Sequence, residues 1–147
     1  MTSASRVMLP AALLLALAGC AQSERPPATA AAPALACPAG AEDWARTELY
    51  FGLSRPDGGK ISDADFQGFV DREVTPRFPD GLTLLPGAGQ WRGGDGRIVK
   101  EGSRILVLLH PATPDVNDEL DEIRGAYKAQ FDQDSVLRVD GASCVSF

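Results

Sequence analysis

Three observations predict an α+β fold for this chain of 147 residues. Residues 47–53 alternate apolar and polar side chains with the period of a β-strand. Two segments, 62–74 and 113–131, carry apolar residues at helical spacing and begin with helix-capping residues. Residues 105–109 (Ile-Leu-Val-Leu-Leu) are apolar on both faces, which is typical of a strand inside a sheet.

The first strand is expected over residues 47–53, where Leu49, Phe51 and Leu53 share one face. After a glycine-rich turn, Ser62 and Asp65 have the spacing of a capping box, so a helix should begin there. Its apolar residues are Phe66, Phe69, Val70 and Val74. Pro76 should end the helix, because proline cannot donate a backbone hydrogen bond.

The next two strands form a predicted hairpin. The second opens at residues 82–85 and is expected to run irregularly to Trp91 through two glycines. Residues 92–96 (Arg-Gly-Gly-Asp-Gly) make the hairpin loop. The third strand covers residues 97–110, and its doubly apolar run predicts a central position in the sheet.

A second helix and a last strand complete the domain. Thr113 is the expected cap and Pro114 suits the first helical position. The apolar stripe of this helix is Val116, Leu120, Ile123, Tyr127 and Phe131. The last strand is expected over residues 135–139 and 142–147, on either side of Gly141.

The order strand, helix, strand, strand, helix, strand predicts a ferredoxin-like antiparallel sheet with both helices on one face. The face opposite the helices would then expose the second apolar side of the third strand. Monomers rarely expose apolar patches of several hundred square ångströms. Either a second copy packs face to face, as in a dimeric α+β barrel, or loops roof a small-molecule cleft there. The homodimer is favoured.

The first residues predict export and a lipid anchor. Arg6 precedes an apolar run at 7–18 that is too short to span a bilayer. Residues 17–20 (Leu-Ala-Gly-Cys) resemble the lipobox of bacterial lipoproteins. We therefore expect a signal peptide at 1–19 and acyl chains such as palmitate on Cys20; the alternative is an ordinary cleaved signal. The implied location is the bacterial cell envelope and, with Ala21 after the cysteine, the periplasmic face of a Gram-negative outer membrane.

Residues 20–43 should form a tether that holds a domain of residues 44–147 off the membrane. Of the 23 residues from Ala21 to Asp43, 13 are alanine or proline, a composition that cannot build a core. The chain has three cysteines. If Cys20 carries lipid, Cys37 and Cys144 remain to form a disulfide, since exported thiols tend to pair. Two free thiols are the alternative.

Charge and motifs exclude several function classes. The chain has 14 basic and 20 acidic residues. Removal of the expected signal peptide would also remove Arg6, which leaves 13 basic residues and a net charge of about −7. Such a balance argues against nucleic-acid binding and against charge-driven adhesion to anionic lipid. The sequence lacks zinc-ligand spacing, a phosphate-cradling glycine loop and a nucleophile elbow. We expect no metal and no other cofactor.

Four segments resemble a bacterial domain-of-unknown-function family, numbered 3574, of short exported proteins. They are residues 47–52 (Thr-Glu-Leu-Tyr-Phe-Gly), 74–83 (Val-Thr-Pro-Arg-Phe-Pro-Asp-Gly-Leu-Thr), 89–91 (Gly-Gln-Trp) and 142–147 (Ala-Ser-Cys-Val-Ser-Phe). The likeness covers residues 44–147. It implies no activity, cofactor or ligand.

Alternation along the strands suggests one candidate catalytic set. If Leu49 faces the helices, Glu48 and Tyr50 face the other way, and Arg138 is expected to join them. His110 joins too if Leu106 and Leu108 share that side. Such a set could make an acid/base site or bind a carboxylate. The alternatives are a solvated His110 at a strand end and a cross-strand ion pair between Arg138 and Glu48.

Other residues suggest ligand binding. Arg77 lies between Pro76 and Phe78 at a helix end, where it caps the helix or holds an anion. Gln90 and Trp91 either line a ligand cleft, or the indole ring of Trp91 packs into the core at the sheet edge. Glu101 either pairs with a nearby basic residue or acts as an acid/base.

The sequence therefore predicts an uncharacterised envelope lipoprotein with a non-enzymatic binding or interaction domain. Its open sheet face would bind a second copy, another protein or a small molecule. The alternative is a small α+β-barrel enzyme that acts on a small organic molecule by acid/base or oxidative chemistry.

Overall fold

The computed structural model describes residues 36–147, which lie within one compact unit, Pro33–Phe147. The expected signal peptide at 1–19, the expected lipidation site Cys20 and most of the expected tether at 20–43 lie outside the described residues. Within the described residues, the hydrophobic core and the sheet lie between residues 42 and 147, so this segment carries its own core.

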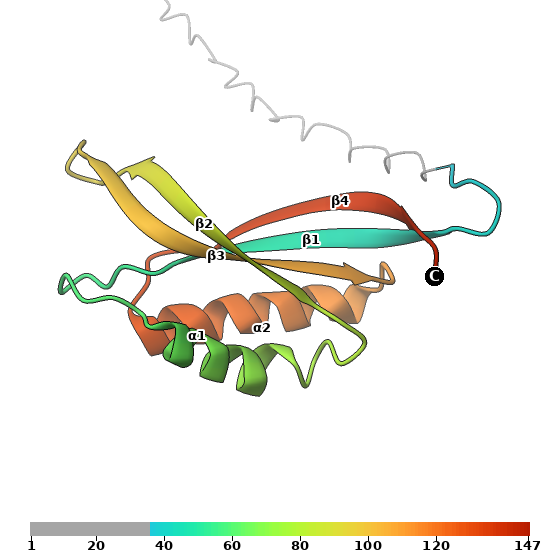
Figure 1. The fold of residues 1–147 in the computed structure, drawn as a ribbon, viewed down its shortest axis with the longest axis horizontal. Helices are drawn as coiled ribbons and strands as arrows, with labels where there is room; N and C mark the ends of the chain where they lie inside the picture. Colours follow the sequence, from blue (N-terminus) through green and yellow to red (C-terminus); the bar gives the residue numbers. More distant parts are fainter. Residues whose placement is uncertain (1–35) are drawn as a thin grey trace, which may run out of the picture. The chain divides into compact units, whose positions relative to one another are not determined.

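The domain has the predicted ferredoxin-like architecture. The elements are β1 (Glu42–Gly52), α1 (Asp63–Phe69), a π-helical turn η1 (Val70–Val74), β2 (Thr83–Arg92), β3 (Ile98–His110), α2 (Pro114–Phe131) and β4 (Leu137–Val145). The antiparallel sheet has the order β2-β3-β1-β4, so β3 lies inside it as predicted. Figure 1 shows both helices against one face.

Two strands differ from the sequence pattern: β1 is longer, and β4 is continuous but runs only from Leu137 to Val145. β1 begins at Glu42 rather than Thr47, because Glu42 pairs with Val145 at the far end of β4. Pairing with β1 likewise carries β4 through Gly141 without a break. Two residues expected in the tether, Glu42 and Asp43, therefore belong to the sheet.

The first helix begins with the predicted capping box. The Ser62 hydroxyl accepts a hydrogen bond from the Asp65 amide at 3.1 Å, and the Asp65 carboxylate accepts one from the Ser62 amide at 3.4 Å. After Phe69 the helix widens into η1, where the Thr75 amide donates to the Val70 carbonyl at 2.9 Å. The spacing of apolar residues did not predict this wider turn. The helical segment ends just before Pro76, as expected.

The core lies between the sheet and the two helices. Its centre is a group of aromatic rings in edge or tilted contact, formed by Phe51, Phe66, Phe69, Tyr127 and Phe131. The Tyr127 hydroxyl donates to the Gly52 carbonyl at 2.8 Å, which satisfies its only buried polar group. Burial raises the pKa of Tyr127 well above its usual range.

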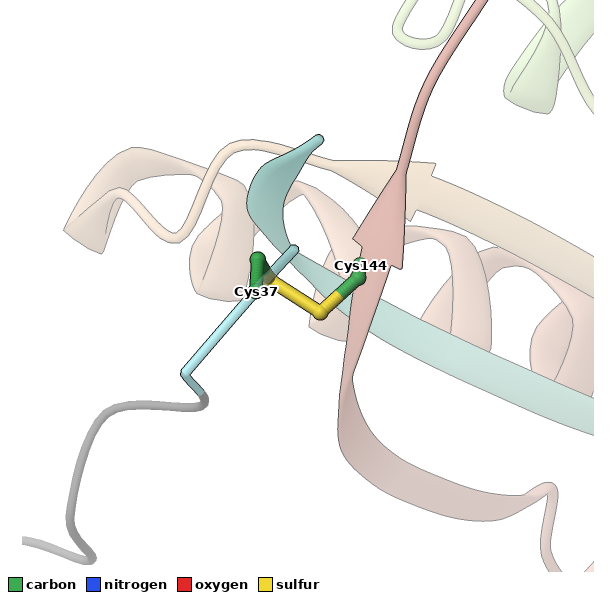
Figure 2. The surroundings of a disulfide bond; sticks show 2 residues. All are labelled: Cys37 and Cys144. Atoms are coloured by element: carbon green, nitrogen blue, oxygen red, sulfur yellow. A yellow bond between two sulfur atoms is a disulfide. The ribbon is translucent and has the colours of Figure 1, made fainter. Parts of the chain in front are cut away.

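The predicted disulfide between Cys37 and Cys144 is confirmed, with 5.4 Å between the two Cα atoms. Figure 2 shows it joining the segment before β1 to β4. Asp43 lies opposite Cys144 in the β1–β4 register, so the chain must turn back before β1 for Cys37 to reach β4. The bond closes a loop of 107 residues and holds the segment before β1 against β4.

Candidate functional site

The sheet face opposite the helices, here called the open face, carries exposed aliphatic side chains and a polar row on β1. Tyr50 lies between Ile105 and Leu137, and Glu48 lies between Val107 and Val139. Four aliphatic side chains on this face are between 39% and 60% exposed: Leu85, Leu109, Leu137 and Val139. No element of the described chain covers them. The predicted apolar face is therefore present.

The polar row consists of Arg46, Glu48 and Tyr50 on alternate positions of β1. The Tyr50 hydroxyl donates to Glu48 Oε2 at 2.6 Å, and Arg46 donates to Glu48 Oε1 at 2.8 and 3.0 Å. The bond from Tyr50, followed by those from Arg46, lowers the pKa of Glu48, and the same bond to Glu48 raises the pKa of Tyr50. The row is thus internally paired and carries no net charge.

The structure does not bring Arg138 and His110 to the open face. Arg138 lies opposite Leu49 and therefore faces the helices, where it donates to Asp140 at 2.9 Å and to Asn117 at 2.7 Å. His110 does share a side with Leu106 and Leu108, but that side is the helix face. The sheet separates both residues from Glu48 and Tyr50, so the four candidates form no common acid/base site.

His110 instead belongs to a small polar network on the helix face. Its Nε2 atom lies 3.1 Å from the hydroxyl of Thr47, and that hydroxyl donates to Asp140 at 2.8 Å. His110 and Thr47 are both buried. No sequence pattern points to Thr47 or Asp140, because only the register of β1 with β4 places them opposite each other.

We expect the Asp140 carboxylate to stabilise the fold in a pH-dependent way. Burial raises its pKa, but the hydrogen bonds from Thr47 and Arg138 outweigh burial and the pKa lies below its usual range. Its contribution is therefore full above the unfolded-state pKa of about 3.9 and is lost as the pH falls through the lower folded-state pKa.

Because this carboxylate is half exposed, the Asp140→Asn substitution should cost at most about 1 kcal/mol at neutral pH. Urea unfolding at neutral and at strongly acidic pH measures this cost. The control is Asp118→Asn, an exposed position on α2, which should leave the unfolding free energy unchanged. An equal cost of Asp140→Asn at both pH values would contradict the assignment.

Arg77 caps the end of η1. Its guanidinium donates to the Glu73 carbonyl at 2.6 Å and to the Glu73 carboxylate at 3.2 Å. The second terminal nitrogen of the guanidinium, Nη2, pairs with the Glu122 carboxylate of α2 at 3.1 Å. Of the two roles predicted for Arg77, the contacts are those of the cap, and they join the end of η1 to α2.

A cavity of about 560 Å³ lies where the β2–β3 hairpin and the loop at 132–135 meet the end of β1. Tyr50, Gln90, Trp91, Glu101 and Leu137 are among its lining residues. The Trp91 side chain is 47% exposed and donates from its indole N–H to Glu101 Oε1 at 3.0 Å. Trp91 is therefore a cavity wall and not a core residue.

Glu101 is held in place from two sides. The Ser54 amide donates to Glu101 Oε2 at 3.3 Å. Gly52 provides the space for this carboxylate, since a Cβ atom there would lie 2.8 Å from Oε2. Within residues 36–147, no Lys or Arg side chain forms an ion pair with Glu101. The ion pair that the sequence suggested between Glu101 and a nearby basic residue is therefore not formed within this segment.

Residues 36–147 contain neither a clustered set of metal ligands nor a membrane-spanning helix. No group of three His, Cys, Asp or Glu side chains in this segment is arranged to hold a metal ion. Neither described helix combines the length and the apolar character that crossing a membrane requires.

Solved structures of other proteins share this fold. A phage SAM lyase in complex with S-methyl-5'-thioadenosine has a TM-score of 0.56 at 12% identity, over 77% of this chain and 95% of the lyase. The apo state of a phage SAM lyase gives 0.52 at 13% identity, over 74% and 91%. CutA from Synechococcus elongatus gives 0.46 at 13% identity, over 69% and 78%. At such identities the likeness to the two lyase structures shows the fold alone.

Sequence comparison assigns the family. No curated protein matches this chain. The model of a family described as "Protein of unknown function (DUF3574)" matches residues 46–147, which include β3, both helices, β4 and most of β1. The match agrees with the resemblance carried by the four sequence segments. The chain therefore belongs to the DUF3574 family.

Proposed function

We propose that this protein is a non-enzymatic envelope lipoprotein whose domain binds through its open face, and that the partner on this face is a second copy of the chain. One observation carries the proposal. Leu85, Leu109, Leu137 and Val139 are 39% to 60% exposed on one continuous sheet face, and no described element covers them. Burying such a patch in an interface removes apolar surface from water.

The size of the open face suits a dimer. Four strands about 4.8 Å apart make a sheet roughly 20 Å wide, and a strand of eleven residues is about 35 Å long. The flat area is then roughly 600 to 700 Å², before side-chain relief is counted. Specific interfaces bury about 800 Å² per partner. The open face alone therefore approaches the area of a standard interface.

The charges on the open face also suit self-association. Arg46 and Glu48 already form an ion pair at 2.8 Å, and Tyr50 occupies the second carboxylate oxygen of Glu48. Burial in an interface would leave neither charge without a partner, which avoids the main cost of burying an ion. A twofold interface also brings each patch against its own copy, so an apolar face meets an apolar face.

The proposed lipid anchor would assist this pairing. Acyl chains on Cys20 and the tether at 20–43 would confine both copies to one membrane surface in the bacterial envelope. Confinement raises the effective concentration of each copy near the other. An interface of modest affinity would then be sufficient.

The substitution Val139→Arg tests the proposal. Val139 lies beside Glu48 on the open face, so a new guanidinium there would meet the apolar face of the other copy. We expect a soluble fragment of residues 36–147 to have the mass of a dimer by light scattering at high micromolar concentration. We expect the variant to be a monomer, with a dissociation constant raised at least about 100-fold, the size of an interface hot spot.

The matched control is Asp118→Arg, an exposed position on α2, which should leave the fragment dimeric. Circular dichroism would verify that both variants fold. A wild-type fragment that stays monomeric at the highest soluble concentration would overturn the proposal. So would a Val139→Arg variant that remains a dimer.

A second candidate function is a small α+β-barrel enzyme acting on a small organic molecule. The cavity beside Tyr50 and Glu101 favours it, and a phage SAM lyase with a similar fold binds S-methyl-5'-thioadenosine. Incubation of the fragment with S-adenosylmethionine, followed by chromatography, tests it. Formation of S-methyl-5'-thioadenosine above the rate without protein would replace the non-enzymatic proposal.

A further inference from the structure

We propose that the cavity at the end of β1 binds a small organic cation, an amine or a sulfonium, that carries a flat apolar group. The site goes beyond the proposed self-association. It lies at the end of the open face that carries Tyr50 and Leu137, and all of its lining residues belong to one chain. Its volume of about 560 Å³ lies within the range of sites for small molecules, about 300 to 1,000 Å³.

The indole of Trp91 supplies a face for a cation or a flat ring. Its N–H is already bonded to Glu101, which fixes the orientation of the ring. With 47% of its surface exposed, the side chain still has ring surface available to a ligand. Indole is the aromatic side chain that attracts cations most strongly. Val99 and Leu137 add apolar wall beside it.

The charges around the cavity select a cation. Three carboxylates line it, Glu101, Asp132 and Asp134, against a single guanidinium, that of Arg55. The Arg55 guanidinium lies over the ring of Phe131, 5.2 Å from its centroid. The lining therefore carries an excess of negative charge, which attracts a cation and repels an anion.

Glu101 is the residue that would contact the cation. Its carboxylate is held by Trp91 and Ser54 through N–H donors, which leave its negative charge in place. Because Gly52 has no side chain, the Glu101 carboxylate can lie close to the backbone of β1. A fixed carboxylate next to an indole offers a cation both a charge partner and an aromatic face. A neutral ligand of the same shape gains only the apolar contact.

Fluorescence of Trp91 can measure binding directly. The chain has two tryptophans, so the substitution Trp44→Phe leaves Trp91 alone. The probe is phenethylamine, a cation at neutral pH with one flat ring, and its neutral counterpart is phenethyl alcohol. With the fragment of residues 36–147 we expect saturable quenching by the amine, at a concentration at least about tenfold lower than for the alcohol, equivalent to about 1.4 kcal/mol.

The variant Glu101→Gln keeps the size of the side chain and removes its charge. We expect it to lose the preference for the amine, so that both probes bind equally weakly. Asp95→Asn, in the hairpin loop and outside the cavity lining, should keep the full preference. The proposal is overturned if neither probe saturates, if wild-type protein binds both equally, or if Glu101→Gln retains the preference. Circular dichroism would show that each variant is folded.

Discussion

Replacing Cys37 and Cys144 together with serine is expected to lower the free energy of unfolding of the fragment 36–147 by about 4 kcal/mol. The disulfide closes a loop of 107 residues, and cross-linking so long a loop removes much of the entropy of the unfolded chain. Domains of this size are stable by only about 5 to 15 kcal/mol. The bond therefore supplies a large share of the total.

The measurement is thermal unfolding followed by circular dichroism, with and without a reductant. We expect the melting temperature of the double variant, and that of the reduced wild-type fragment, to fall together by more than about 15 °C. The fragment contains no other cysteine, so the comparison is free of alternative pairings. A double variant that melts within a few degrees of the oxidised fragment would contradict this account.

The substitution Phe51→Ala is expected to cost about 3 to 5 kcal/mol, because truncating a buried ring leaves a cavity. Phe51 is fully buried, and its ring lies 4.6 Å from that of Tyr127 and 5.5 Å from that of Phe66. It thus joins the sheet to both helices. Urea unfolding measures the cost as a lower midpoint with an unchanged slope.

Phe147→Ala is the matched control for this substitution. Phe147 is fully exposed, and its ring is in edge contact with that of Trp44 at 5.9 Å between centroids. Its removal should cost less than about 1 kcal/mol. If the two substitutions were equally costly, the aromatic core could not be the main source of stability.

Local patterns were sufficient to predict the order of the elements. The structure has the capping box at Ser62 and the proline at the start of α2 at the positions that the sequence predicts. The ends of strands were harder, because β1 gains Glu42 to Arg46 only through pairing with β3 and β4. These residues do not alternate in the way a strand pattern requires, so only the partner strands reveal them.

The faces of strands depend on register, which the sequence does not give directly. Val136, buried in the core, is two residues before Arg138, and this spacing places Arg138 on the helix face. Leu137 and Val139 are as apolar as Val136, so neither side of β4 could be assigned to the core from sequence. The condition that would place His110 beside Glu48 is not met, because Leu106 and Leu108 face the helices and His110 shares their side.

The cavity could not be predicted as a unit. Trp91 and Glu101 were considered separately, because their contact arises from the β2–β3 hairpin. The space that holds Glu101 comes from the glycine at position 52, on a third strand. A constellation drawn from several strands and the loop at 132–135 leaves no continuous signature in the chain.

The most direct test of the proposed self-association is a dilution series of the fragment 36–147 with labelled methyl groups, followed by NMR. The account predicts concentration-dependent shifts for the methyl groups of Leu85, Leu109 and Val139 on the open face. It predicts constant shifts for the methyl groups of Leu120 and Ile123, which lie buried in the core on α2. Constant shifts on the open face across the whole series, or changes confined to the helices, would contradict it.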